Sequence, residues 1–464
     1  MTRSLLLPVE TLNREFDAKL LLALYAAARG WEVVLGQKTA LHRRMARFPR
    51  SVYVAKGFRW GREREFREIG ALGHTIVGMD EEGLVNVSDE MWLSRSDSPT
   101  LRHLALIVAW GPDDARLYRR ATHLGDTPVV ETGNARVDLL RPELEGFLAP
   151  EAARLRERYG DFALVNTNFA LVNRYVELNA PVQMGNWLPQ EVAEGLKSNW
   201  IGHKKALLEA FLALLPRLAG RLGPRTLVIR PHPSENAELW REAAEGLGNV
   251  RVVHEGTVAP WLLAAKVLIH NGCTTAVEAA VLGTPALAYR PVTRVGFDND
   301  LPNGLSEEFA DGDALADRAA ELTRQPVQGR VALSPERRAL LERHLTALDG
   351  PLACDRLIDA LEDRIGPPAP VEPLRYAVAR GHIVRRRVRR ALRTTSKWAG
   401  RKSALLGHQF PHVPLGEVEA RLGRLDAALG GIAEVSAEEL APNLFRVRSS
   451  GSPARSSRAE ARPG

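Results

Sequence analysis

The sequence predicts an α/β fold with two Rossmann-like, doubly wound parallel-sheet domains that face a cleft, followed by a basic helical extension. First, short apolar stretches alternate with amphipathic stretches over residues 1–365, which is the βαβ rhythm of a parallel sheet. Second, polar residues directly follow most of the predicted strands, at the edge where parallel sheets bind ligands. Third, 464 residues are enough for two cores, whereas one domain of this length would be unusual.

The predicted N-terminal domain covers residues 1–140 and forms one side of the cleft. Its strands are expected at 4–9, 32–35, 51–55, 75–77, 104–110 and 128–131, and its helices at 17–29, 61–69 and 113–123. No glycine fingerprint of the dinucleotide type follows the first strand, so the sequence does not support NAD binding.

The predicted C-terminal domain covers residues 150–365, with residues 139–151 as the linker. Its strands are expected to start at 162 and to cover 226–230, 250–253, 267–270 and 286–289. Helices are expected within 191–222 and over 238–247, 275–282, 314–324, 335–348 and 352–364.

The turn after the strand at 267–270 is the basis of the site prediction. It reads Asn271-Gly-Cys-Thr-Thr275 and opens onto a helix that Gly283 and Pro285 end. Free N–H groups at a helix N-terminus favour an anion, and glycine lets a phosphate approach the backbone. The turn therefore predicts a phosphate-bearing ligand. Alternatively, Thr275-Ala-Val-Glu278 forms a capping box, in which Glu278 only returns a hydrogen bond to the cap.

A second strand ends in a similar polar turn. The strand at 226–230 leads into Arg230-Pro-His-Pro-Ser234, where two prolines stiffen the chain around His232. A single histidine is usually a structural residue, but two anion-ready turns at the carboxyl ends of strands in one domain favour a ligand contact.

Together, Arg230-Pro-His-Pro and His270-Asn-Gly-Cys-Thr-Thr with Glu278 and Gly283-Thr-Pro resemble the donor-side motifs of GT-B glycosyltransferases of bacterial surface polysaccharides. The nearest group is the surface carbohydrate biosynthesis protein family, which is similar to capsule Kdo transferases, sialyltransferases and CDP-glycerol glycerophosphotransferases. The resemblance covers about residues 1–365. It implies a nucleotide-activated donor, with CMP- or CDP-linked donors favoured, and a saccharide or lipid-linked acceptor.

The resemblance also implies roles for individual residues. Arg230 and His232, with the turn at 271–275, would hold the phosphate and stabilise the charge that develops on the leaving nucleotide. Glu278 would bind the ribose hydroxyls. The full set of expected donor-binding residues is Arg230, His232, Ser234, Asn271, Gly272, Thr274, Thr275 and Glu278.

The base that deprotonates the acceptor is expected in the N-terminal domain, across the cleft. Glu10 is the first choice and Asp17 the second, because both follow the first strand, and burial should raise the pKa of a useful base. With His232, they complete the expected catalytic set. Further residues expected to line the cleft are Lys56, Asp80, Glu81, Asn134, Arg136, Asn166 and Asn168.

No metal and no cofactor are predicted. Asp298-Asn-Asp300 has a spacing that could hold a divalent cation, but it lies in a polar stretch where a solvated loop is the favoured interpretation. Two other functions stay open. One is a nucleotide-sugar epimerase on the same fold, which would need an acidic pair beside the phosphate turn; the other is a non-catalytic binding protein that acts through its basic segment.

The third predicted region, residues 366–447, is a basic helical extension. The chain carries a net charge of +7, yet residues 373–410 hold eleven Arg or Lys and no acid, which leaves −4 for the rest. Its apolar residues Tyr376, Ile383, Val384, Val388, Leu392 and Trp398 are expected to share a helical face, which suits an anionic membrane surface. Nucleic acid is disfavoured because neither an aromatic platform nor zinc-ligand spacing accompanies the arginines.

The remaining expectations concern location and the chain end. The charged residues after Val9 exclude a signal peptide, and two cysteines fit a reducing compartment. We therefore expect a cytoplasmic protein that is peripheral on the inner face of the membrane. Residues 415–447 are expected to add one more helical piece, and residues 448–464 a disordered tail.

Overall fold

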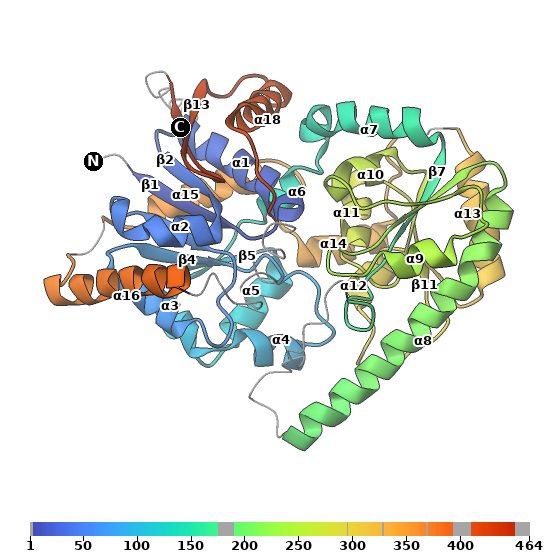
Figure 1. Cartoon of the computed structure of the whole chain (residues 1–464), viewed down its shortest axis with the longest axis horizontal. Helices are drawn as coiled ribbons and strands as arrows, with labels where there is room; N and C mark the ends of the chain where they lie inside the picture. The colour runs from blue at the N-terminus through green and yellow to red at the C-terminus, as the bar shows by residue number, and fades with distance from the viewer. Residues whose placement is uncertain are drawn as a thin grey trace, which may run out of the picture.

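The computed structural model describes residues 3–174, 190–294, 296–326, 329–367, 370–392 and 410–450, with the backbone alone for 190–197 and 386–392. The described chain forms two α/β domains that lie side by side (Figure 1). One contains an eight-stranded sheet of order β13-β14-β2-β1-β3-β4-β5-β6, and the other a six-stranded sheet of order β12-β11-β10-β7-β8-β9.

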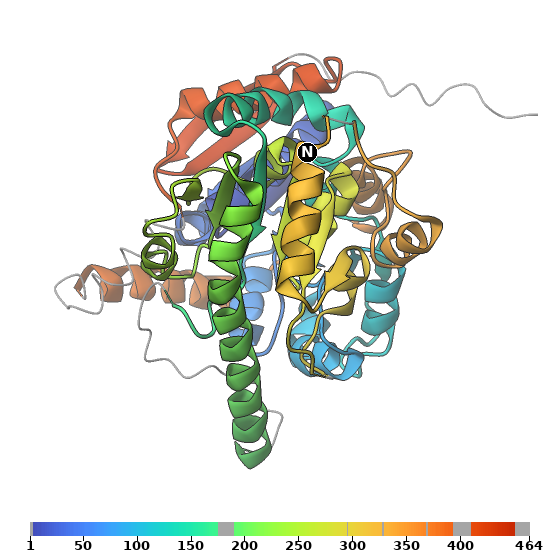
Figure 2. The ribbon, with the colours of Figure 1, turned by 90° about the vertical axis from the view of Figure 1, so that its right-hand side faces the viewer.

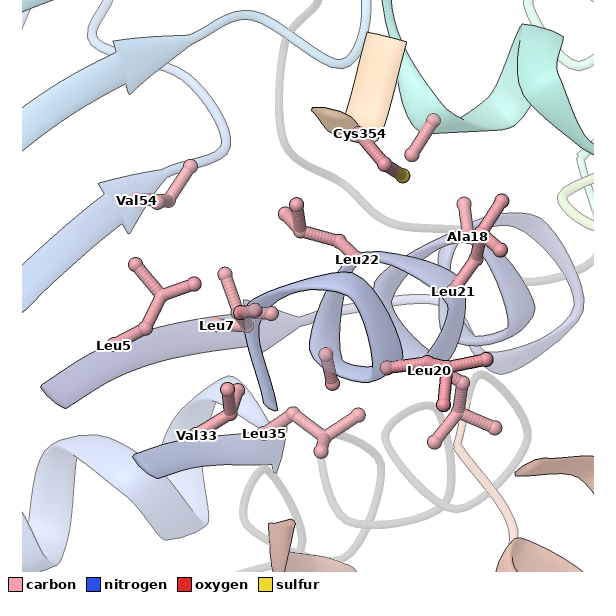
Figure 3. Close-up of a cluster of buried hydrophobic side chains, with 14 of the residues drawn as sticks. Leu5, Leu7, Ala18, Leu20, Leu21, Leu22, Val33, Leu35, Val54 and Cys354 are labelled. Atoms are coloured by element: carbon pink, nitrogen blue, oxygen red, sulfur yellow. The ribbon is translucent and has the colours of Figure 1, made fainter. Parts of the chain in front are cut away.

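The N-terminal sheet is built around six parallel strands: β1 (Ser4–Val9), β2 (Glu32–Gln37), β3 (Val52–Ala55), β4 (Thr75–Met79), β5 (Leu106–Ala109) and β6 (Val129–Glu131). The helices between them are α1 (Leu12–Ala28), α2 (Lys38–Arg44), α3 (Glu63–Ala71), α4 (Asp89–Ser96) and α5 (Pro112–Arg119), and the short α6 (Ala135–Asp138) follows β6. Apolar side chains of α1 cover one face of the sheet (Figure 3), whereas α2, α3 and α5 cover the other.

The C-terminal sheet is wholly parallel: β7 (Phe162–Asn166), β8 (Thr226–Arg230), β9 (Val250–Val252), β10 (Val267–His270), β11 (Ala286–Tyr289) and β12 (Glu307–Phe309). One face packs against α8 (Gln190–Leu222), α9 (Glu238–Ala243) and α13 (Gly312–Arg324), and the other against α7 (Glu145–Tyr159), α10 (Val258–Ala264) and α11 (Thr275–Leu282). Figure 2 shows that α8 extends beyond the body of its domain. The short α12 (Asp300–Gly304) lies before β12, and α14 (Pro335–His344) follows α13.

The predicted fold class, two doubly wound parallel-sheet domains, is confirmed. The bounds of β8, β10, α11 and β11 are those expected from the sequence. Gly283 takes the left-handed conformation (φ +73°) that ends α11. The linker predicted at 139–151 is partly wrong, because α7 begins at Glu145.

Helix α15 (Ala353–Arg364) falls within the region assigned to the C-terminal domain, but it packs against the N-terminal domain. Its Leu357, Ile358 and Leu361 belong to the core that α1 forms with the N-terminal sheet. Asp138, at the end of α6, accepts hydrogen bonds from the backbone N–H groups of Ala353 (2.8 Å) and Cys354 (2.9 Å) and so holds the start of the helix. The chain therefore crosses back to the first domain after α14.

The prediction of a purely helical piece over 415–447 is wrong. Helix α18 (Leu415–Ala428) is followed by a hairpin of β13 (Val435–Ala441) and β14 (Leu444–Ser449), and β14 pairs antiparallel with β2. The side chains of β14 alternate between the two faces of the sheet. Phe445 and Val447 point into the core beside α1, whereas the side chain of Arg448 is exposed. β14 also extends into the predicted tail, of which residues 451–464 lie outside the described residues.

The basic segment forms α16 (Pro373–Leu392), which lies beside α3 on the N-terminal domain (Figure 1). Its side chains Ala379 and Ile383 are buried there, and His382 Nδ1 lies 3.2 Å from Glu68 Oε1. None of the helices in the described part of the chain is long and apolar enough to cross a membrane.

Candidate active site

Three neighbouring strands of the C-terminal sheet end at the same level. Arg230 on β8 pairs in register with Asn166 on β7, and Asn166 pairs with His270 on β10. The strand order reverses between β7 and β10, and such a switch point is where open α/β sheets bind ligands in the crevice at their carboxyl edge. The structure thus brings the two predicted turns together around Asn166.

The turn at 271–275 is held in shape by its neighbours. Gly272 has a φ of +78°, which favours glycine. Its N–H donates to His270 Nδ1 (3.0 Å), and its carbonyl accepts from Asn299 Nδ2 (2.8 Å). His270 Nε2 lies 2.8 Å from Ser306 Oγ, and burial lowers the pKa of His270 to about 3, so the ring is neutral and positions the turn.

Several buried polar atoms at this edge have no hydrogen-bond partner within the described part of the chain. They are Asn166 Oδ1 and Nδ2, Asn271 Oδ1 and Thr275 Oγ1. Buried polar groups are normally paired, because an unpaired one costs about 1–3 kcal/mol. Their convergence at the switch point therefore indicates a place for a polar ligand. Thr274 is the cap residue of α11 and makes no side-chain capping bond.

Contacts with neighbouring residues also hold the Arg230-Pro-His-Pro turn in place. The Arg230 guanidinium lies 5.1 Å from the centre of the Trp261 ring and donates to the carbonyls of Glu255 (2.9 Å) and Gly256 (3.0 Å). Burial lowers the pKa of Arg230 to about 10, which leaves it charged at neutral pH. It is a buried, fixed cation that can form charge-assisted hydrogen bonds with an anionic group.

Glu235, which the sequence analysis missed, ties this turn to the loop after β7. Its Oε1 accepts from Thr167 Oγ1 (2.9 Å), the Phe169 N–H (2.8 Å) and the His232 N–H (3.3 Å), and its Oε2 accepts from Trp240 Nε1 (3.2 Å). An acidic residue in a polar turn carries no sequence signal that it will be buried.

His232 faces the N-terminal domain. Its Nδ1 accepts from the Ser234 N–H (3.2 Å), which leaves Nε2 as the donor, and the Ser234 side chain itself is exposed. Burial, with Arg14 of the other domain contributing, lowers the pKa of His232 to about 4. The imidazole is therefore neutral at physiological pH.

Residues of both domains meet at Glu278. Arg136 Nη2 lies 2.8 Å from Glu278 Oε1, Arg136 Nη1 donates to the Glu81 carbonyl (3.2 Å), and Arg14 donates to the same carbonyl (3.0 Å). This geometry contradicts the capping-box alternative, because Glu278 faces the N-terminal domain instead of its own helix start. Asn134 caps α6 by accepting from the Arg136 N–H (2.9 Å), and its Nδ2 has no described partner. The Asn168 carbonyl accepts from Asn271 Nδ2 at 3.5 Å.

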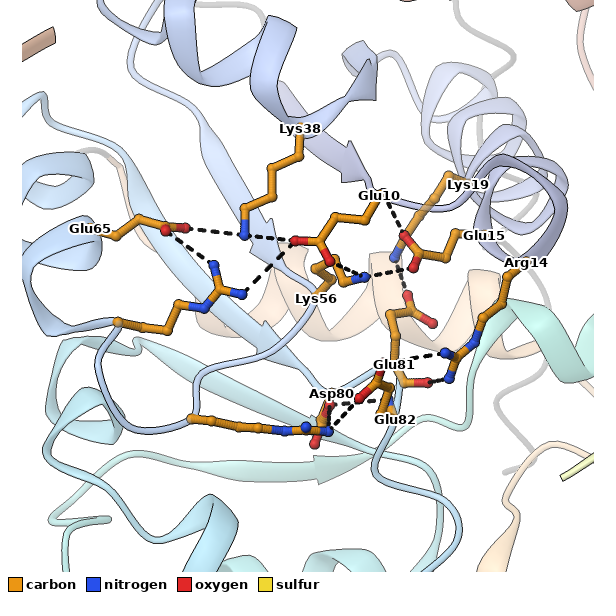
Figure 4. A network of polar contacts seen from close by, with 12 residues as sticks. Glu10, Arg14, Glu15, Lys19, Lys38, Lys56, Glu65, Asp80, Glu81 and Glu82 are labelled. Atoms are coloured by element: carbon orange, nitrogen blue, oxygen red, sulfur yellow. Dashed lines mark hydrogen bonds and ion pairs between the residues drawn. The ribbon is translucent and has the colours of Figure 1, made fainter. Parts of the chain in front are cut away.

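Glu10 lies at the switch point of the N-terminal sheet, between β1 and β3 (Figure 4). Its carboxylate contacts Lys56 (2.8 Å) and Lys38 (3.0 Å), and Lys56 also contacts Glu15 (2.6 Å). Burial opposes ionisation, but Lys38 and Lys56 outweigh it and lower the pKa of Glu10 to about 2. This shift is opposite to the one expected of a general base.

The other predicted carboxylates are also engaged. Asp17 contacts Arg421 of α18 (2.7 Å), so it joins α1 to the C-terminal extension. Glu81 and Lys19 form a fully buried pair (2.6 Å; Figure 4), and despite burial Lys19 lowers the pKa of Glu81. Asp80 lies 3.6 Å from Arg95 and 3.8 Å from Arg59.

Asp114, in the first turn of α5, is a carboxylate with the opposite property. Burial raises its pKa from 3.8 to about 7, although the Trp110 N–H donates to its Oδ2 (3.0 Å). Its Oδ1 has no hydrogen-bond partner among the described residues. The sequence analysis missed Asp114, because Asp113 and Asp114 have identical local signals and only the fold buries the second.

The Asp298-Asn-Asp300 segment is held by protein contacts. Asp298 lies 3.1 Å from Arg290 Nη2 and 3.5 Å from His203 Nε2, and Asp300 starts α12. Within the described ranges no group of His, Cys, Asp and Glu side chains could hold a metal ion.

No family model matches the sequence, and no curated protein matches it. Similar solved structures include the wall teichoic acid polymerase TagF soaked with CDPG, at 10% identity over 78% of this chain and 88% of that chain, with a TM-score of 0.49. They also include the Methanocaldococcus jannaschii UDP-GlcNAc 2-epimerase with UDP-GlcNAc and UDP (11% identity, 78% and 100% covered, TM-score 0.47). HepE from Anabaena with UDP-glucose is a third (11% identity, 78% and 99% covered, TM-score 0.40). Since these scores lie below 0.5, the function proposed below rests on the residues and geometry of this chain.

Proposed function

We propose that the protein is a GT-B-type glycosyltransferase, or a polyol-phosphate transferase, that uses a nucleotide-activated donor in bacterial surface polysaccharide biosynthesis. The observation that carries this proposal is the convergence of Arg230, Asn166 and the 271–275 turn at the switch point of the C-terminal sheet, with partnerless polar atoms. The acceptor would be a saccharide or a lipid-linked saccharide that enters from the N-terminal domain.

In the proposed reaction the donor phosphate binds at the start of α11, where the positive end of the helix dipole lies and Thr275 Oγ1 has no described hydrogen-bond partner. Arg230 supplies the fixed positive charge, and His232 can donate from Nε2 to a leaving phosphate oxygen. Both groups stabilise negative charge that grows as the bond to the nucleotide breaks. Glu278 would exchange its contact with Arg136 for the ribose hydroxyls.

The alternative functions find less support in the geometry. An epimerase needs an acidic pair beside the phosphate turn, yet Glu235 is saturated with hydrogen bonds and Glu278 faces Arg136. A non-catalytic protein that binds its partner through the basic segment would not need the partnerless polar atoms at the carboxyl edge of the C-terminal sheet, which lie far from that segment.

Thermal unfolding with CMP, CDP, UDP, GDP and ADP tests the proposal. A ligand at about 100 times its dissociation constant adds roughly 2.7 kcal/mol to the stability of the folded state, which shifts the transition by a few degrees. We expect CMP or CDP to stabilise the wild type but not Arg230→Ala. Arg221→Ala is the control, since this exposed arginine contacts Asp317 on the surface. A wild type that responds to none of the five nucleotides would contradict the proposal.

We also propose that α16 holds the protein on the inner face of the cell membrane, in the cytoplasm. The predicted apolar face needs a correction, because Tyr376 and Ile383 pack against the N-terminal domain. The outward side instead exposes Leu374 (70%), Val378 (51%) and Val384 (55%), next to exposed arginines 375, 380 and 385. The side chains of 386–392 and all of 393–409 lie outside the described residues, including Val388, Leu392 and Trp398.

This membrane contact can be measured by flotation with phosphatidylcholine vesicles that contain or lack phosphatidylserine. We expect binding to the anionic vesicles alone, because each cation near the lipid contributes about 1 kcal/mol. The Leu374→Asp, Val378→Asp double variant should lose this binding, because it removes the apolar side chains that insert and adds two negative charges. The exposed Val331→Asp substitution on the other domain is the control. Equal binding by the double variant would exclude α16 as the contact.

A further inference from the structure

A pocket lies beside the predicted phosphate turn, between α8, the end of β10 and the segment that leads into α12. Its lining includes His203 and Lys204 from α8, Asn271 from the turn, and Asp298 and Asn303 from the far side. Four of these residues are buried. Asn271, Asn303 and His203 are 3–6% exposed, and Lys204 is 8% exposed.

Lys204 has no partner that explains its burial. In the described ranges no acidic side chain lies within ion-pair distance of its ammonium group, and it makes no hydrogen bond there. Asp298 is the nearest acidic lining residue, but Arg290 and His203 engage its carboxylate. Burial lowers the pKa of Lys204, while Cys273, Asp298 and Glu235 oppose this shift. Lys204 thus places a cation without a described ion-pair partner in the pocket lining, on a side chain that is otherwise buried, so its ammonium group is available to a counter-ion there.

The other unsatisfied atoms of the pocket are two acceptors, Asn271 Oδ1 and Asn303 Oδ1, together with the ring nitrogens of His203 and the Arg290 Nε donor. Asn271 Oδ1 and Asn303 Oδ1 are buried and accept no hydrogen bond from a described residue. A complementary ligand therefore presents a negatively charged oxygen group to Lys204 and O–H or N–H donors to the two asparagines. A phosphate or carboxylate on a hydroxylated carbon skeleton meets both conditions.

We propose that this pocket is an anion subsite that binds an oxyanion of the donor, with Lys204 as its cation. The inference rests on the proposed function, because the pocket shares Asn271 and Gly272 with the phosphate turn. The oxyanion can come from a second phosphate of the donor or from a carboxylate on the transferred sugar.

Isothermal titration calorimetry with Lys204→Met separates these sources. If the oxyanion is a second phosphate, the variant loses affinity for CDP by about tenfold or more and keeps its affinity for CMP. If it is a sugar carboxylate, the variant loses binding of glucuronate in the presence of CMP, with glucose as the uncharged probe. Lys205→Met is the matched control. It removes the same charge from the neighbouring residue, whose side chain is exposed. Unchanged affinity in both arms overturns the subsite.

The ligand-free proteins provide a second readout. Removing an unpaired buried charge should leave the melting temperature of Lys204→Met equal to or above that of the wild type. A lower melting temperature with unchanged affinities would make Lys204 a structural residue and overturn the inference. If Arg230→Ala loses CDP while Lys204→Met keeps its affinity for both CDP and glucuronate, the subsite fails and the proposed function stands. A wild type without nucleotide affinity overturns both.

Discussion

At the scale of single residues, burial decides which carboxyl groups can exchange protons near neutral pH. Glu10 and Asp114 both follow parallel strands of the N-terminal sheet, but their pKa values are shifted in opposite directions, to about 2 and about 7. Glu10 has two lysine partners, whereas the buried carboxylate of Asp114 has no cation in contact with it in the described part of the chain. Of these two carboxyl groups, only Asp114 changes its charge near neutral pH.

Asp114 makes the stability depend on pH. Between pH 3.8 and about 7 the folded protein binds a proton that the unfolded chain has released, so the stabilisation is present at low pH and is lost as the pH rises through 7. Asp114→Asn removes this dependence. Relative to the wild type, the variant should gain about 1.4 kcal/mol per pH unit between pH 5 and 7 and little above that.

Denaturant unfolding of both proteins from pH 5 to 8 measures this difference. The exposed Asp126→Asn variant serves as the control, and its difference from the wild type should not follow the same course. A constant difference between Asp114→Asn and the wild type would show that Asp114 is ionised throughout.

At the scale of elements, the late hairpin completes the first sheet. β14 covers the edge of β2, and Phe445 packs edge-on against Phe16 of α1, with ring centres 6.2 Å apart. Phe410 contacts the same ring at 5.9 Å. The hairpin thus protects an otherwise open parallel edge and buries the far side of α1.

Phe445→Ala should lower the free energy of unfolding by about 3–5 kcal/mol, because it leaves a cavity in the core. Arg448→Ala, three residues on and exposed, should change it by less than about 0.5 kcal/mol. Chemical denaturation compares them. Equal small effects would show that the hairpin does not contribute to the core of the N-terminal domain.

At the scale of the whole molecule, the two domains are joined by more than the linker. Trp110 and Val137 from the first domain pack with Val277, Leu301 and Leu341 from the second. Arg141 also donates to the Ala347 carbonyl (2.9 Å), just before the chain returns to the first domain as α15.

We therefore expect the two domains to unfold together. Calorimetry should show one transition, with a ratio of calorimetric to van't Hoff enthalpy near one. Two resolved transitions would show instead that the interface core and α15 contribute little to the coupling between the domains.

The sequence by itself determined the fold class and the elements that surround the phosphate turn. The β-branched strand 226–230, the strand 267–270 and the helix ended by Gly283 were placed correctly, because their signals lie within a few neighbouring residues. The same local signals showed that a polar turn follows each of these two strands. The sequence also located the basic amphipathic helix, although not the side that faces outward.

Only the tertiary structure decided the electrostatic state of the site and the pairings between distant segments. Asp17 contacts Arg421, 404 positions away, and β14 joins β2 across the whole chain. The ionisation of Glu10 depends on Lys38 and Lys56, which parallel pairing brings to the end of β1. Burial and long-range partners set these properties, and neither leaves a mark in the local sequence.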